Sequence, residues 1–162
     1  MHDNPRLTLR KADYEGVKQP IRVILDSRFR TPRNSNVLTD GAPTLVVSDS
    51  GLECFGSLSS IGIEKAAEVE VDGPRDLENL LKLLALLGCN DVLVEAGTKV
   101  VSSFLNGDYW DEWISYVAPM LLGKDSRRLT DLEIVAIQDG VSAQVTGRKI
   151  LGSDFRLILR PS

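Results

Sequence analysis

The sequence feature that most constrains the fold lies between Asp91 and Leu105. Its first part, Val92–Val94, is a short apolar run rich in β-branched residues, which predicts a buried strand. Glu95 follows this run, and Gly97 comes two residues later. The next apolar residues recur at helical spacing, at Val100, Val101, Phe104 and Leu105. A buried strand that turns through a glycine directly into a helix predicts an α/β protein.

The same junction predicts a ligand site. Ligands of open α/β sheets bind beside the carboxyl ends of the strands, which is where Glu95 would lie. The first N–H groups of a helix have no partner within the helix and can bind a phosphate. Gly97 would let a ligand approach the backbone closely. The alternative is a structural turn in which Glu95 caps the helix or faces water.

Helical and extended patterns alternate along the rest of the chain. Strands are predicted at Ile21–Leu25, Thr44–Val47 and Ala67–Val71, whereas the glycine- and serine-rich segment Leu52–Gly62 is ambiguous. A leucine stripe followed by Gly88 predicts a helix over Pro74–Leu87. Four further strands are predicted at Trp113–Ala118, Leu132–Ile137, Gln144–Leu151 and Phe155–Leu159, the last two joined as a hairpin. The whole pattern predicts an α/β protein with a mixed sheet flanked by helices and a strand-rich, antiparallel C-terminal part.

Composition excludes several functions. A net charge of −4 without a basic and aromatic patch argues against a nucleic-acid surface. No apolar run approaches the length of a membrane span, and Cys54 and Cys89 have no neighbouring cysteine, so we expect a cytoplasmic protein. The only histidine is His2, so no zinc site is expected. The length of 162 residues predicts a single domain.

Four segments carry a family resemblance. They are Asp3–Arg10 (D-N-P-R-L-T-L-R), Gln19–Pro32 with its D-S-R-F-R-T-P exit, Val94–Gly97 (V-E-A-G), and Asp111–Gly123 (D-E-W-I-S-Y-V-A-P-M-L-L-G). In this order they resemble the pyrimidine reductase of riboflavin biosynthesis, which is the C-terminal reductase domain of the bifunctional deaminase/reductase. The resemblance covers nearly the whole chain.

The resemblance implies a dihydrofolate-reductase-like fold and a cytoplasmic homodimer. It also implies NADPH-dependent reduction of the ribosyl group of 5-amino-6-(5-phosphoribosylamino)uracil, or of its diaminopyrimidinone analogue, to the ribitylamino product. The chain contains no G-x-G-x-x-G, so a standard Rossmann dinucleotide site is not expected. Alternatives are a noncatalytic remnant or interaction module of this fold, and a reductase of another substrate.

The resemblance also implies site residues, although it identifies no catalytic one. Substrate contacts fall on Leu7, Arg10 and Glu95. Cofactor contacts fall on Asp3, Ser27, Gly97, Thr98, Lys99, Val100, Val101, Ser102 and Ser103. Each has a simpler reading, since Asp3 could belong to a frayed terminus, Arg10 to the solvated surface and Ser27 to an ordinary turn. Arg28 and Arg30 could meet the 2′-phosphate of NADPH, or face water.

In the family, a strand with a K-x-A-x-S-x-D-G-like signature and a second strand precede the loop that Asp3–Arg10 resembles. Here the sequence begins at that loop. We therefore expect residues 1–162 to form a reductase domain that lacks the family's first strands and any deaminase domain. Such a domain is expected to be a poor reductase by itself.

Overall fold

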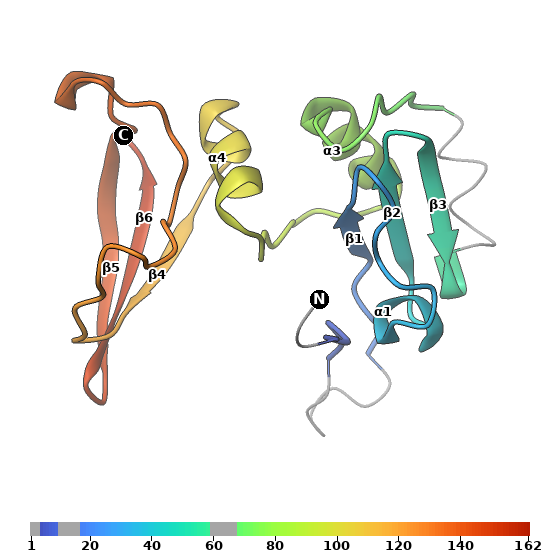
Figure 1. Cartoon of the computed structure of the whole chain (residues 1–162), viewed down its shortest axis with the longest axis horizontal. Coiled ribbons are helices and arrows are strands. Elements are labelled where there is room, and N and C mark those ends of the chain that lie inside the picture. Colours follow the sequence, from blue (N-terminus) through green and yellow to red (C-terminus); the bar gives the residue numbers. More distant parts are fainter. Residues whose placement is uncertain (1–3, 10–16, 59–67) are drawn as a thin grey trace. The chain divides into compact units, whose positions relative to one another are not determined.

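The computed structural model describes residues 4–9, 17–58 and 68–162, shown in Figure 1. The chain divides into two compact units, Met1–Val92 and Leu93–Ser162, which are described separately below. Within the described ranges, no helix is long and apolar enough to cross a membrane.

The first unit is built on a mixed three-stranded sheet in the order β1-β2-β3 (Figure 1). Strand β1 (Arg22–Leu25) pairs in parallel with β2 (Thr44–Ser48), and β2 pairs in antiparallel fashion with β3 (Gly51–Phe55). All five residues of β2 are buried, as its apolar, β-branched sequence predicts. The first two strands confirm the sequence prediction, whereas β3 occupies the segment that the sequence left ambiguous.

Two short helices flank the strands of this sheet in sequence. Helix α1 (Asn36–Thr39) precedes β2, and the 3-10 helix η2 (Gly56–Leu58) follows β3. Val37 and Leu38 of α1 form a core cluster with Val46, against which three partly buried side chains pack: Ile24, Phe29 and Phe55. The connection between β1 and β2 is therefore fixed by apolar packing.

Helix α3 (Leu77–Leu86) confirms the predicted leucine-rich helix, although it begins three residues after Pro74. The start is set by Asp76, whose side chain accepts a hydrogen bond from the N–H of Asn79. Four leucines are buried: Leu77, Leu80, Leu83 and Leu84. Gly88 has a φ of +84°, a left-handed conformation that favours glycine and ends the helix.

The second unit contains α4 (Thr98–Asn106) and an antiparallel sheet in the order β4-β6-β5. Its strands are β4 (Trp113–Val117), β5 (Ala143–Leu151) and β6 (Asp154–Pro161), with the 3-10 helix η3 (Ile137–Asp139) before β5. A tight turn with Gly152 at a φ of +66° joins β5 to β6. The predicted helix, hairpin and antiparallel C-terminal sheet are confirmed.

Three predicted strands are absent from the part of the chain that the structure describes. Val92–Val94 has no regular secondary structure, and Val92 and Leu93 are 44% and 80% exposed. Leu132–Ile137 is also unpaired and leads into η3. In Ala67–Val71, Ala67 lies outside the described residues, and Val71 is buried without joining the sheet. All three predictions rested on apolar sequence, but a strand also requires a neighbouring backbone to bond.

Candidate active site

Glu95 lies in the unpaired segment that leads into α4. The sequence predicted a carboxylate at the end of a buried strand, and this was wrong, because residues 91–97 form no strand. The Glu95 side chain is exposed, two residues before the helix cap. Its position beside the start of α4 agrees with the prediction.

The amino end of α4 is open. Gly97 is the N-cap residue, and no side chain caps the helix. The N–H of Val101 bonds the carbonyl of Gly97 at 3.1 Å, as the first turn of a helix requires. The preceding N–H groups of a helix have no partner within it and carry the positive end of its dipole. This terminus has the donor set of an anion site.

Gly97 itself has an ordinary extended conformation, with φ −78° and ψ 171°. Its backbone therefore does not require glycine. A Cβ atom built at Gly97 would meet no atom of the chain within 4 Å. The missing side chain leaves open space at the helix cap, which agrees with close approach by a ligand.

The hydroxyl groups of α4 are engaged by the chain's own backbone. Thr98 donates to the carbonyl of Arg128 at 2.8 Å, and Ser103 donates to the carbonyl of Lys99 at 3.0 Å. The buried hydroxyl of Ser102 accepts the N–H of Asp131 at 2.6 Å. Two of these bonds fasten α4 to residues 128–131. A phosphate at this helix would consequently be held mainly by backbone N–H groups.

The predicted cofactor residue Ser27 is exposed in the turn that follows β1. Its carbonyl accepts the N–H of Asp49 at 3.0 Å, which ties this turn to the end of β2. Ser27 therefore lies at the carboxyl end of the parallel pair β1 and β2, where the rule for open sheets places a ligand.

Asp26 shapes the turn that carries Ser27. Its buried carboxylate accepts both the N–H and the hydroxyl of Thr31 at 2.7 Å, and it also accepts the N–H of Arg30. Burial raises the pKa of the Asp26 carboxyl, but these hydrogen bonds outweigh the effect of burial, so the pKa lies below its usual value. The turn is consequently held by a charged side chain that accepts several hydrogen bonds.

Phe29 holds the other side of this turn. It has a φ of +47°, a conformation that L-residues rarely adopt, and its ring packs against the core cluster. The guanidinium of Arg33 lies 4.1 Å from the ring centroid and pairs with Glu53 at 2.9 Å. The turn after β1 is thus fixed by the hydrogen bonds of Asp26 and by the packing of Phe29 against the core cluster.

Leu7 is the one predicted substrate residue of the first unit within the described part. It is 44% exposed and has a φ of +52°. Asp3 and Arg10 lie outside the described residues. The predicted site residues thus fall on two units, with Leu7 and Ser27 in the first and Glu95 and Gly97–Ser103 in the second.

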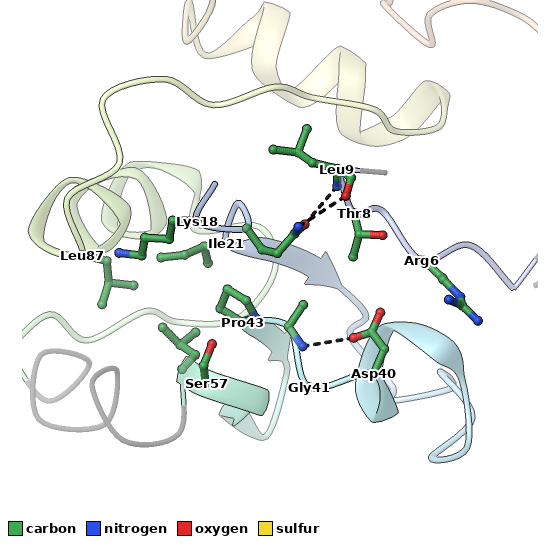
Figure 2. A pocket seen from close by; sticks show the side chains of 13 residues that line it. Arg6, Thr8, Leu9, Lys18, Ile21, Asp40, Gly41, Pro43, Ser57 and Leu87 are labelled. Atoms are coloured by element: carbon green, nitrogen blue, oxygen red, sulfur yellow. Dashed lines mark hydrogen bonds between the residues drawn. The ribbon is translucent and has the colours of Figure 1, made fainter. Parts of the chain in front are cut away.

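A pocket of about 600 Å³ in the first unit does not coincide with the predicted site (Figure 2). It is bordered by Ile21 and Pro43, which directly precede β1 and β2, and by Leu87 at the end of α3. Ile21 and Pro43 lie at the amino ends of the parallel strands. Ser27 lies at the opposite ends of these strands, whereas Arg6, Thr8 and Leu9, which flank the predicted substrate residue Leu7, line the pocket.

Sequence analysis did not single out Asp26 or Arg22, which are both buried and charged, and Arg22 pairs with Asp40 at 2.7 Å. Asp26 appeared only within a matched motif, and Arg22 only as one position of an apolar strand. A charged residue inside an apolar strand was the signal for Arg22, because burial of an arginine requires several partners.

The protein is of the mixed α/β class, since it combines parallel and antiparallel strand pairings with helices. This confirms the expected fold class. The chain belongs to the family described as RibD C-terminal domain, which matches residues 1–152.

Relatives and solved structures agree with this assignment. The chain is 37% identical over 159 residues to the 2,5-diamino-6-ribosylamino-4(3H)-pyrimidinone 5′-phosphate reductase of Methanothermobacter thermautotrophicus, covering 94% of this chain and 71% of that protein. It is 31% identical to the riboflavin biosynthesis protein RibD of Aquifex aeolicus, covering 98% of this chain and 43% of the relative. RibD of Acinetobacter baumannii superposes with a TM-score of 0.77 at 29% identity, over 99% of this chain and 44% of that one. The chain therefore spans less than half the length of these two RibD proteins.

Proposed function

We propose that this chain is an NADPH-dependent reductase of riboflavin biosynthesis. Its substrate would be 5-amino-6-(5-phosphoribosylamino)uracil or the 2,5-diaminopyrimidinone analogue, and its product the corresponding ribitylamino compound. The observation that carries the proposal is the match over 94% of the chain with a protein named as a pyrimidinone 5′-phosphate reductase. A further relative, from Buchnera aphidicola, is named as a 5-amino-6-(5-phosphoribosylamino)uracil reductase and is 29% identical, so both pyrimidines are candidates.

The chemistry requires a hydride donor and a proton. When bound, NADPH supplies a hydride for C1′ of the ring-opened ribosylamino group and leaves as NADP⁺, while the nitrogen attached to C1′ gains a proton from solvent or an acid. The protein's contribution is to bind and orient the substrate and the cofactor and to exclude water. We assign no residue to the transfer of the proton.

The amino end of α4 suits a phosphate of this cofactor. Its N–H groups are not capped by a side chain, and the space beside Gly97 is open. A phosphate there would be stabilised by several charge-assisted hydrogen bonds and by the helix dipole. We propose that Gly97, Thr98, Lys99, Val100, Val101, Ser102 and Ser103 form this segment of the cofactor site, with Asp3 and Ser27 as further contacts.

The substrate would be held by Leu7, Arg10 and Glu95. An exposed carboxylate such as that of Glu95 can accept hydrogen bonds from ribose hydroxyls or pyrimidine N–H groups. The planar guanidinium of Arg10 suits the phosphate of the ribosyl group.

We further propose that residues 1–162 form one reductase domain whose sheet requires additional strands. In the described part of the chain, β1 pairs only with β2, which leaves its other edge open. Residues 91–97 also pair with no described strand. An open edge of this kind is able to pair with a further strand. Such a strand could come from the same protein or from a partner, and we propose a cytoplasmic homodimer as the working form.

The test is to follow NADPH oxidation with each pyrimidine separately and to identify the product by mass spectrometry. The expected product is heavier than the substrate by two hydrogen atoms, one gained as a hydride and one as a proton. NADH in place of NADPH tests the choice of cofactor. A folded protein that binds neither NADPH nor either pyrimidine would support a noncatalytic remnant, and turnover only with another carbonyl or imine compound would support a reductase of a different substrate.

A further inference from the structure

The loop of residues 4–9 has an unusual backbone. Both Asn4 and Leu7 have left-handed φ values, +35° and +52°, although neither is glycine. Such conformations persist only where the surrounding structure holds them, and they concentrate at functional sites. The described residues show what holds this loop.

Three side chains from outside the loop anchor its backbone. Asn36 bonds Asn4 twice, through its N–H to Oδ1 at 2.9 Å and through Nδ2 to the carbonyl at 2.8 Å. Gln19 accepts the N–H of Leu9 at 2.9 Å and donates to its carbonyl at 3.3 Å. The remaining anchor is Arg22, whose Nη1 donates to the carbonyl of Arg6.

Arg6, whose carbonyl Arg22 binds, directly precedes Leu7. The anchors therefore hold the backbone on both sides of Leu7, while the Leu7 side chain remains 44% exposed. Leu9 is similarly exposed, at 40%, but Leu7 is the one with a left-handed backbone, and the anchors at Arg6 and Leu9 fix the direction of its side chain.

Arg22 couples the loop to the interior of the unit. Its side chain is 2% exposed and pairs with both carboxylate oxygens of Asp40, at 2.8 Å from Nη1 and 2.7 Å from Nη2. Nη2 also donates to the carbonyls of Val37 at 2.8 Å and Ala42 at 3.0 Å, and both Nε and Nη2 donate to the hydroxyl of Thr44. The hydrogen bond from Arg22 holds the pKa of the Asp40 carboxyl below its usual value, so the pair remains charged.

A buried guanidinium is stable only when its donors are bonded. The carbonyl of Arg6 supplies one of these acceptors, so the position of the loop and the satisfaction of the buried charge depend on each other. The same guanidinium bonds α1 through Val37 and β2 through Thr44, which fixes the loop relative to the sheet.

We propose that Arg22 is a positioning residue, which with Gln19 holds loop 4–9 so that Leu7 meets the pyrimidine substrate. The inference rests on the proposed function and deepens it. Arg22 does not touch the substrate itself, because its side chain is buried and its donors are directed to the chain. Its effect is transmitted through the backbone of Arg6 and Leu7.

Gln19→Ala is the most direct test, because it removes a half-buried anchor without disturbing the buried ion pair of Arg22 and Asp40. Loss of this anchor should raise the KM for the pyrimidine about two- to tenfold, the effect of about one hydrogen bond. The kcat at saturating substrate and the Kd for NADPH should stay within about twofold, as should amide exchange outside the loop. Gln19→Glu keeps the 2.9 Å acceptor for the N–H of Leu9 but loses the donor to the carbonyl of Leu9, so it should recover only part of the rise in KM.

Gln144→Ala is the matched control, since it removes an exposed glutamine from β5 of the other unit. Its kinetics should equal those of the wild type. Arg22→Met is the stronger variant and should raise the KM for the pyrimidine more than tenfold, with faster amide exchange in residues 4–9. If Arg22→Met does not fold, Gln19→Ala and Gln19→Glu still decide the question.

The outcomes separate the two proposals. An active wild-type protein whose KM is unchanged in Gln19→Ala would overturn the inference alone, as would equal losses of pyrimidine and NADPH binding. A wild-type protein that neither binds nor reduces a pyrimidine would overturn the proposed function and this inference with it.

Discussion

Replacing Gly97 with serine separates the stability of α4 from its proposed binding of a cofactor phosphate. The backbone of Gly97, at φ −78° and ψ 171°, is one that serine adopts readily at a helix cap. A Cβ atom would meet no atom of the chain within 4 Å. The fold therefore tolerates the change, and the serine hydroxyl can accept an N–H of the first turn. We expect the helix to be stabilised by a few tenths of a kcal/mol, about 1–3 °C in melting temperature.

The same hydroxyl would compete with a bound phosphate. It would occupy one of the N–H donors, and its Cβ would narrow the space at the cap. Loss of one hydrogen bond to a charged group costs about 1.5–3 kcal/mol. This corresponds to a Kd for NADPH that is about ten- to a hundredfold weaker. Gly97→Val should weaken binding similarly, but with slightly lower stability because valine is a poor N-cap.

Titration calorimetry with NADPH and thermal melts of the same samples measure both effects. Gly123→Ser is the matched control, because Gly123 lies in the same unit and also has open space at its Cβ position. A wild-type Kd in Gly97→Ser would refute the assignment of a phosphate to α4. A large fall in melting temperature would refute the argument from open space.

Three further predictions concern the carboxylates and the sheet. Glu95→Gln should lower kcat/KM roughly ten- to a thousandfold, about 1.5–4 kcal/mol, while the melting temperature and the Kd for NADPH stay unchanged; near-normal turnover would rule out Glu95 as a substrate ligand. The lowered pKa of Asp26 means that its carboxylate stabilises the fold above its ordinary value near 3.8 and that this stability is lost as the pH falls through the lower folded value. Asp26→Asn should therefore cost about 1–3 kcal/mol near neutral pH and flatten the loss of stability below about pH 4 in circular-dichroism melts, and an unchanged acid profile would contradict this. A version extended upstream by the family's first strands should oxidise NADPH with the pyrimidine orders of magnitude faster than residues 1–162, since positioning contributes several kcal/mol; equal rates from a well-folded monomeric short chain would disprove the need for those strands.

Local pattern in the sequence was sufficient for much of the fold. The leucine stripe of α3, the helical spacing of α4 and the hairpin of β5 and β6 were all predicted. These elements form their own hydrogen bonds within a few residues or across a tight turn. Their periodicity therefore carries nearly all the information that they need.

Tertiary structure decided which segments pair as strands and which side chains bond residues that are far away in the sequence. Val92–Val94 has the composition of a buried strand, but no described backbone pairs with it. The hydroxyls of Thr98 and Ser102 have the chemistry of phosphate ligands, but they bond residues 128–131. Arg22 lies in an apolar strand, and its role became visible only with Asp40 and the carbonyl of Arg6 beside it.

The candidate site residues also divide into what the sequence predicted and what only the tertiary structure showed. The sequence alone named Leu7, Ser27, Glu95 and Gly97 from matched motifs, and their roles remain predictions. The structure added how two of the loops that carry them are held, through Arg22 and Asp26. A motif records which side chains are present, whereas the direction of a loop depends on hydrogen-bond partners 5 to 32 residues away in sequence, which no local pattern specifies.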